Sequence, residues 1–305
     1  MPETSLRENV RGIVAMVACN LLFLINDTLL KIVNGDGMPL SEILFFRGLF
    51  VSAVLLPMVL YTGAHRQIAL VRSWQMFWRT VAEIGAASLY LLALFHIPIA
   101  NANTIAQIVP LLVTGAGAVF LGEIVGWRRW TAIAVGFGGV IIVMRPGFSG
   151  FSAFSLLTLA SAFCVTLRDM ATRVMPRAVP ALLISLVTGA SVGLSGPVLG
   201  LAIGETWVAP PAASLGLIIV AVFFLLGGYL TSIATMRHGD ISVVAPFRYT
   251  VIVWAMIVGF VVWREVPDWP MLAGTAVIAA AGIYTFSRER NLARLREEAA
   301  SGEGL

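Results

Sequence analysis

Charged residues are scarce in this chain. Asp, Glu, Lys and Arg together make up 12% of its 305 residues, whereas 59% are hydrophobic. A soluble domain carries about 25% charged residues, so the composition excludes a soluble globular protein and indicates a polytopic membrane protein. Twenty basic residues stand against sixteen acidic ones. From this small positive balance we expect no nucleic-acid partner.

Residues with redox, metal or nucleotide chemistry are also few. The only cysteines are Cys19 and Cys164, both inside apolar runs, and no CxxC spacing occurs, which excludes a disulfide framework and a thiolate metal site. The only lysine is Lys31, and the absence of a GxxxxGK[ST] motif excludes an ATP-driven pump. We therefore expect no metal and no cofactor.

The chain is rich in apolar runs of about 20 residues, the length that crosses a bilayer. Short breaks separate them, such as NGDGMP at 34–39, which has the composition of a turn. The predicted fold class is an all-α integral membrane protein with ten transmembrane helices. The predicted spans are 12–33, 40–61, 74–95, 99–121, 127–145, 152–174, 181–203, 213–236, 241–263 and 268–287.

Basic residues predict the orientation of these spans. If the N-terminus is inside, three basic residues (Lys31, Arg145 and Arg264) lie at the outer span ends and fifteen at the inner ends. This positive-inside bias predicts a multi-pass protein of the plasma membrane, the inner membrane in a bacterium, with both termini cytoplasmic. The fifteen are Arg7, Arg11, Arg66, Arg72, Arg79, Arg128, Arg129, Arg168, Arg173, Arg177, Arg237, Arg288, Arg290, Arg294 and Arg296.

A repeat becomes visible when the chain is shifted by 142 residues. Asp27 then falls on Asp169, and Glu123 falls on Glu265, without a gap. Five spans per half is an odd number, so the second half enters from the opposite side. This predicts two inverted five-helix repeats, an arrangement of many secondary transporters. The predicted divisions are a cytoplasmic N-terminus (1–11), a first repeat (12–145), a linker (146–153), a second repeat (154–287) and a charged cytoplasmic tail (288–305).

The repeat also sorts the polar residues. Those shared by both halves, among them Glu123 and Glu265, are predicted to belong to the scaffold. Arg47, Glu83 and Arg248 have no charged counterpart in the other half, and are better candidates for a binding site. An ionisable group inside a bilayer is costly and is tolerated where it faces a partner or a wet cavity.

Two pairings of these charges are hypothesised, Glu83 with Arg248 and Asp27 with Arg47. By helix rise, Glu83 lies roughly 13 Å from the end of its span, close to mid-membrane. If the charges line a cavity between the halves, they form a site for a zwitterionic or hydrogen-bonding solute, and Asp27 and Glu83 are candidates for coupling. The alternative is that both pairs are structural staples between helices.

Prolines interrupt the fourth and ninth spans beside further polar residues. Pro110 follows Gln107, and Pro246 precedes Tyr249. Proline removes a helical hydrogen bond, so each is predicted to kink its span toward a cavity as part of the scaffold. Interhelical hydrogen bonding is the alternative role for the polar neighbours. The candidate lining residues are Arg47, Trp78, Glu83, Asn103, Gln107, Arg248 and Tyr249.

These stretches together resemble the drug/metabolite transporter superfamily, and within it the ten-helix EamA-type permeases with two five-helix repeats. Glu123 matches the Gly-Glu motif of the family, whereas its counterpart reads Arg264-Glu265, a departure from the motif. Arg47 matches the arginine of the second span. The resemblance rests on SEILFFRGLF (41–50), FHIPIANANTIAQIVPLL (95–112), FLGEIVGWRRW (120–130) and GDISVVAPFRYTVIVWAMIVGFVVWREVPDW (239–269).

The resemblance implies secondary transport of a small organic solute, without ATPase or other enzyme activity. Because the candidate site mixes Arg, Glu, Gln and aromatic side chains, we expect uptake of an aromatic or zwitterionic metabolite. Riboflavin and S-adenosylmethionine are the named candidates, and export of amino acids or drugs is the alternative. The fused repeat leaves open a monomer or a homo-oligomer, embedded in membrane lipid.

Two function classes compete with transport. The stretch Gly193-Leu194-Ser195-Gly196 has the GxSG pattern of rhomboid-type intramembrane proteases, with His238 as the candidate base. A serine nucleophile needs a histidine within hydrogen-bond reach, but Ser195 is predicted deep in its span and His238 at a helix end. We therefore assign no catalytic residue. A sensory protein is disfavoured by the lack of a soluble domain.

Overall fold

The computed structural model describes residues 6–123, 125–147, 151–176, 178–237 and 241–302, and the elements in these residues are helical. The α-helices, in chain order, are α1 (Leu6–Gly35), α2 (Leu40–Tyr61), α3 (Trp74–His96), α4 (Ile99–Ala106), α5 (Val109–Phe120), α6 (Trp127–Met144), α7 (Ala153–Arg173), α8 (Ala181–Ile203), α9 (Ala212–Arg237), α10 (Ile241–Val244), α11 (Thr250–Trp263) and α12 (Trp269–Gly302). Two 3-10 helices are η1 (Ala64–Val71) and η2 (Ala245–Tyr249).

Ten stretches of the described residues are long and apolar enough to cross a membrane, as the sequence predicted. Their bounds differ from the predicted ones by a few residues. The first runs from Arg7 to Gly35, and the tenth from Trp269 to Arg288. Helix α12 itself continues beyond that span to Gly302.

The chain forms two compact units. Unit 1 contains Met1–Leu22, Asn103–Phe151 and Gly227–Leu305, and unit 2 contains Phe23–Ala102 and Ser152–Leu226. Helices α1, α4 and α9 each contribute one part to either unit. Because each unit takes helices from both halves of the chain, the predicted division into two sequence repeats stays a prediction.

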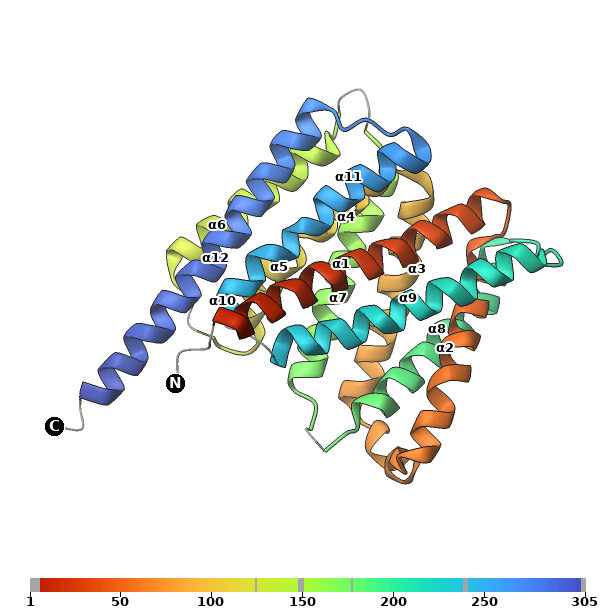
Figure 1. Cartoon of the computed structure of the whole chain (residues 1–305), viewed down its shortest axis with the longest axis horizontal. Coiled ribbons are helices and arrows are strands. Elements are labelled where there is room, and N and C mark those ends of the chain that lie inside the picture. Colours follow the sequence, from red (N-terminus) through yellow and green to blue (C-terminus); the bar gives the residue numbers. More distant parts are fainter. Residues whose placement is uncertain (1–5, 124, 148–150, 177, 238–240, 303–305) are drawn as a thin grey trace. The chain divides into compact units, whose positions relative to one another are not determined.

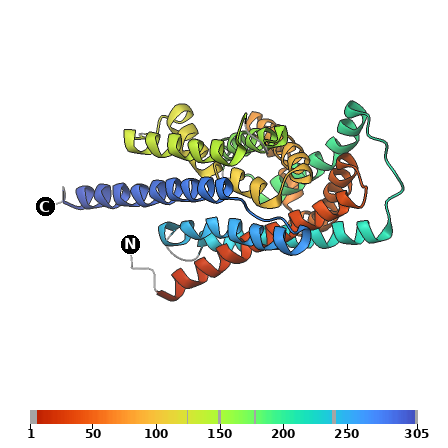
Figure 2. The same ribbon diagram turned by 90° about the horizontal axis from the view of Figure 1, so that it is seen from above.

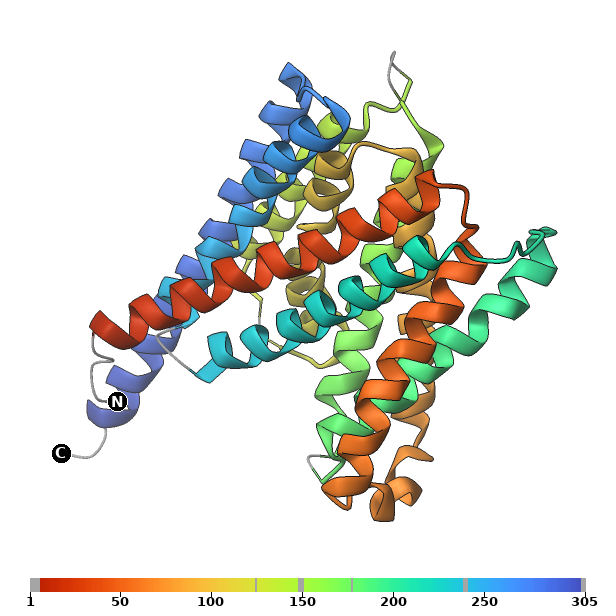
Figure 3. The same cartoon turned by 45° about the vertical axis from the view of Figure 1, so that its right-hand side comes forward.

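In unit 2, α2 packs against α8 and α3 packs against α7 (Figures 1 and 3). The first pair is joined by glycines, since a Cβ atom at Gly48 would lie 2.3 Å from the Cα atom of Gly193. Only glycine permits this approach of two helix backbones. Beside this contact, Val51 and Leu55 of α2 form an apolar cluster with Val222 of α9.

In unit 1, α6 lies along α12 (Figure 2). These two helices are the fifth spans of their repeats, just as α2 and α8 are the second spans. Helix α1 also contacts α9, because the Cys19 thiol is 3.4 Å from the carbonyl oxygen of Gly228. The contact pattern is consistent with inverted repeats.

Two spans are interrupted at equivalent places, and both breaks lie in unit 1. The fourth span ends its first helix at Ala106 and starts again at Val109, with Pro110 in the first turn of α5. The ninth span changes to 3-10 geometry over Ala245–Tyr249, with Pro246 in its first turn. Position 106 shifted by 142 is position 248, so both repeats break their helix at the same point. Discontinuous helices of this kind are typical of transporter binding regions.

The Gly-Glu motif and its altered counterpart have the same backbone geometry. Gly122 (φ 69°) and Arg264 (φ 59°) are both left-handed. The backbone N–H of the glutamate that follows each bonds an equivalent glycine carbonyl, at 3.1 Å in Glu123 and 3.0 Å in Glu265. The arginine in the second motif therefore keeps the turn, although a left-handed conformation is costlier for arginine than for glycine.

Candidate functional site

Unit 2 contains a charged network around Glu83, which we call the Glu83 layer (Arg79, Glu83, Arg168, Asp169, Thr172 and Thr188). Arg168 lies between two carboxylates, with Nη1 3.1 Å from Glu83 Oε2 and Nε 2.9 Å from Asp169 Oδ1. Arg79 donates to the hydroxyls of Thr172 at 3.0 Å and Thr188 at 2.6 Å. Helices α3, α7 and α8 supply these side chains, and each arginine has polar partners from a neighbouring helix.

A second polar group in unit 2 surrounds Asp27, and we call it the Asp27 layer (Asn26, Asp27, Arg47 and Tyr90). The Asp27 carboxylate accepts hydrogen bonds from the Tyr90 hydroxyl at 2.9 Å and the Asn26 amide at 3.0 Å. The positive charge of Arg47 on α2 lies within electrostatic range of this carboxylate. Tyr90 follows Glu83 by seven residues on α3, so the two layers lie about 10 Å apart along that helix.

Lys31 caps the C-terminal end of α3 beside the Asp27 layer. Its Nζ donates to the carbonyl oxygen of Ile97, the C-terminal cap of α3, at 2.6 Å. A cation is favourable at this place because the last carbonyls of a helix lack intrahelical partners.

In unit 1, the two interrupted spans meet at their breaks. Arg248 Nε donates to Gln107 Oε1 at 3.3 Å. The buried Asn20 side chain of α1 donates, each at 3.1 Å, to the carbonyl oxygens of Phe247 and Arg248 and to the Thr250 hydroxyl. Asn20 therefore satisfies backbone carbonyls that the broken helix leaves without helical partners.

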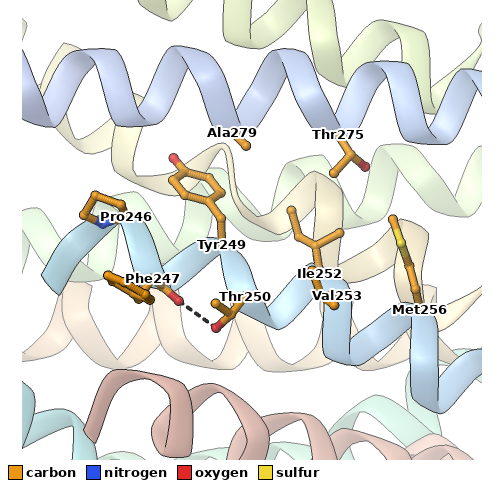
Figure 4. Close-up of a pocket in the computed structure, with 9 residues that line it drawn as sticks. All are labelled: Pro246, Phe247, Tyr249, Thr250, Ile252, Val253, Met256, Thr275 and Ala279. Carbon is orange, nitrogen blue, oxygen red and sulfur yellow. Dashed lines mark hydrogen bonds between the residues drawn. The ribbon is translucent and has the colours of Figure 1, made fainter. Parts of the chain in front are cut away.

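Beside this break lies an apolar pocket of about 410 Å³ between η2–α11 and α12 (Figure 4). Tyr249 and Ile252 point toward α12, which carries Thr275 and Ala279. The Tyr249 hydroxyl packs against Gly282 and is buried without a hydrogen-bond partner. The pocket offers apolar contact but few polar groups, so it suits the apolar part of a molecule.

A third ion pair lies outside the spans. Arg145, the C-terminal cap of α6, pairs with Asp268, which also accepts from the N–H of Met271 at 3.1 Å. Partial burial alone would raise the pKa of the Asp268 carboxyl, but the hydrogen bonds from Arg145 and Met271 outweigh it and hold the pKa below its usual range.

The structure gives the hypothesised charge pairs a different arrangement. Glu83 pairs with Arg168, and Arg248 bonds Gln107, so each has a partner other than the one that the sequence indicated. Asp27 bonds Tyr90 and Asn26, with Arg47 nearby. Whether any of these residues binds a solute stays a prediction.

Two other candidates lie in separate surroundings. Trp78 belongs to an exposed aromatic cluster with Trp74 and Phe77, whose ring centroids are 5.3 to 5.6 Å apart. Exposed aromatic residues at a helix end are typical of the membrane interface. Asn103 is buried in α4. Their roles as lining residues also stay predictions.

Sequence reasoning missed several of the polar partners. Asn20, Tyr90 and Arg168 were not selected, although helical spacing contains a signal for the first two. Asn20 precedes Asp27 by seven residues, and Tyr90 follows Glu83 by seven, so each pair shares one helix face. For Arg168, the signal that sequence reasoning did not use is its position next to Asp169 in the chain.

The GxSG pattern has a plain structural role. The Ser195 hydroxyl donates to the carbonyl oxygen of Val192 in its own helix, at 2.7 Å. The candidate base His238 lies outside the described residues, as does Arg177 of the orientation argument.

Comparison with known proteins identifies the class. Residues 10–145 match the model of the EamA-like transporter family. This match agrees with the resemblance found in the motifs of the chain. The protein is accordingly a transporter of small metabolites and not an enzyme.

Relatives of established name are similar over most of their length. The S-adenosylmethionine uptake transporter of Rickettsia felis is 26% identical over 283 residues, 89% of this chain and 91% of the relative. The pseudopaline exporter CntI of Pseudomonas aeruginosa is 27% identical, covering 89% and 94%. The riboflavin transporter of Vibrio cholerae is 23% identical, covering 93% and 98%.

A solved crystal structure shares the fold. It superposes with a TM-score of 0.61 over 92% of this chain and 96% of its own, at 17% identity. At that identity the likeness concerns the fold alone.

Proposed function

We propose that this protein is a secondary transporter that takes up a zwitterionic or aromatic metabolite by alternating access. The observation that carries the proposal is a set of charged side chains on membrane-spanning helices, of which Asp27 and Arg47 are partly exposed. Lipid cannot solvate such groups, so they are expected to face water or solute. S-adenosylmethionine and riboflavin are the first solutes to test, since relatives carry those names.

Export is the second candidate direction. It is favoured by the similarity to the pseudopaline exporter, which covers as much of the chain as the similarity to the uptake transporters. The proposed orientation has both termini on the cytoplasmic side, in accordance with the distribution of basic residues.

The test is flux in proteoliposomes. Purified protein is reconstituted, and accumulation of labelled S-adenosylmethionine, riboflavin and a panel of amino acids is followed with and without a pH gradient. Saturable accumulation of one solute supports a carrier, and its response to the gradient tests proton coupling. If solute leaves but never enters vesicles of defined orientation, the direction is export. Folded protein that moves none of these solutes would contradict the proposal.

A further inference from the structure

The Asp27 layer is assembled at one depth in the membrane by three helices. Asp27 lies eight residues before the end of α1, Arg47 seven residues after the start of α2, and Tyr90 six residues before the end of α3. These ends lie on the same side of the membrane, because each connection between the helices follows one crossing. At the helical rise, all three residues are about 9–12 Å from that side.

Arg47 has hydrogen-bond donors in reserve. A guanidinium carries five N–H donors in a planar fork that matches a carboxylate. Within the described residues, the Arg47 side chain forms no hydrogen bond, and the residue is partly exposed. A desolvated cation without hydrogen bonds is costly inside a bilayer, so a partner that arrives with the solute would relieve that cost.

Asp27 has acceptor capacity in reserve. An ionised carboxylate offers about four lone-pair sites, and Asn26 and Tyr90 use one on each oxygen. These two donors come from the same helix and from α3, so they fix the orientation of the carboxylate. The residue is partly exposed, and the remaining lone pairs of its carboxylate can accept from a further donor.

We propose that the Asp27 layer binds the α-amino acid group of the transported solute, with Arg47 holding the carboxylate and Asp27 the ammonium. This inference rests on the proposed transport function. A zwitterion can enter between opposite charges because it replaces their mutual attraction with two new ion pairs. Tyr90 and Asn26 act as positioning residues for Asp27.

The proposal separates the two named candidates by their chemistry. S-adenosylmethionine carries an α-ammonium and an α-carboxylate, whereas riboflavin carries neither group. The Asp27 layer therefore favours S-adenosylmethionine and other α-amino acids over riboflavin.

The experiment is competition for binding of labelled S-adenosylmethionine to the purified full chain. The competitors are S-adenosylmethionine, its decarboxylated analogue, which keeps the ammonium, and 5′-methylthioadenosine, which has neither group. A hydrogen-bonded ion pair contributes about 10- to 100-fold in affinity. Wild-type protein is therefore expected to prefer S-adenosylmethionine over the decarboxylated analogue by that factor.

Two variants assign the groups. Arg47→Gln is expected to lose the preference for S-adenosylmethionine over its decarboxylated analogue. Asp27→Asn is expected to weaken both ammonium-bearing ligands and to leave 5′-methylthioadenosine unchanged. Arg145→Gln, at a helix cap, is the matched control for loss of one positive charge and is expected to keep every preference. If Arg47→Gln is not monodisperse, Arg47→Lys replaces it and is expected to retain a reduced preference.

Distinct results would overturn the proposal. A preference that survives Arg47→Gln, or a uniform loss for all three ligands in both variants, would make the layer structural. Binding and flux of riboflavin alone by the wild type would leave the transporter function intact and remove this inference. If the folded wild type binds and moves no solute of the panel, the proposed function itself fails.

Discussion

Two aspartates of unit 2 occupy equivalent places in the two repeats but have different surroundings. Asn26 donates to Asp27 at 3.0 Å, and Arg168 donates to Asp169 at 2.9 Å. Positions 26 and 168 differ by 142, as do positions 27 and 169. The contact between neighbouring side chains is therefore kept in both repeats, while its donor is neutral in the first and cationic in the second.

The other contacts of each layer agree with this difference in the charge of the donor. The cation at Arg168 is matched by a second carboxylate, Glu83, at 3.1 Å. In the Asp27 layer the cation is Arg47, which comes from another helix and forms no recorded hydrogen bond among the described residues. A staple between helices needs its charges satisfied in the resting protein. A binding layer keeps donors and acceptors for its ligand, and the Asp27 layer has that property.

The largest expected effect comes from making the Glu83 layer like the Asp27 layer. Arg168→Asn copies the residue at position 26 and leaves Glu83 without its cation. The pair is partly buried, and removing one member of a buried ion pair costs at most about 3 kcal/mol, so the melting temperature in detergent is expected to fall. Binding preferences among zwitterionic analogues are expected to stay.

The matched control for this change is Arg47→Gln, which removes the same charge from the Asp27 layer. Its effect on the free energy of unfolding is expected to be within about 1 kcal/mol, as for weakly paired charges, while the ligand preference is lost. Equal destabilisation by the two variants would erase the distinction between staple and binding layer.

A smaller effect is expected for Tyr90, which lies on α3, the helix that also carries Glu83. Tyr90→Phe removes the hydroxyl that donates to Asp27 at 2.9 Å. A hydrogen bond to a charged acceptor contributes about 1.5 kcal/mol. A double-mutant cycle of Tyr90→Phe and Asp27→Asn, measured by unfolding in detergent, is expected to show coupling of that size. Additive effects would mean that the hydroxyl stabilises α3 independently of Asp27.

The fold follows from sequence to a large extent. Apolar runs of membrane length identified all ten spans, since hydrocarbon permits only segments that satisfy their own backbone. The prolines at 110 and 246 indicated the interrupted spans because proline cannot continue the helical bonding pattern. The grouping into two compact units was not predicted, because spacing along the chain does not determine which helices share contacts.

The site was less predictable than the fold. Depth and charge selected Asp27, Arg47 and Glu83, which all lie in the two polar layers. Depth does not give the direction of a side chain around its helix, so the ion pair of Glu83 with Arg168 was not predicted. Arg168 was counted among the basic residues of a helix end, where snorkelling toward water is the ordinary expectation.

The smallest expected effect concerns the exposed pair Arg145–Asp268, which has charges like those of the layers but half of the Asp268 side chain exposed. Asp268→Asn is expected to cost at most about 1 kcal/mol.

The pKa of Asp268 in the folded state is lowered, so the contribution of the carboxylate is fully present above its unfolded pKa of about 3.9. It is lost as the pH falls through the folded-state pKa. The difference in melting temperature between wild type and variant is therefore expected to be constant from about pH 5 to 8 and to shrink in acid. A difference that grows in acid would show that Asp268 is more basic in the folded protein than this pairing allows.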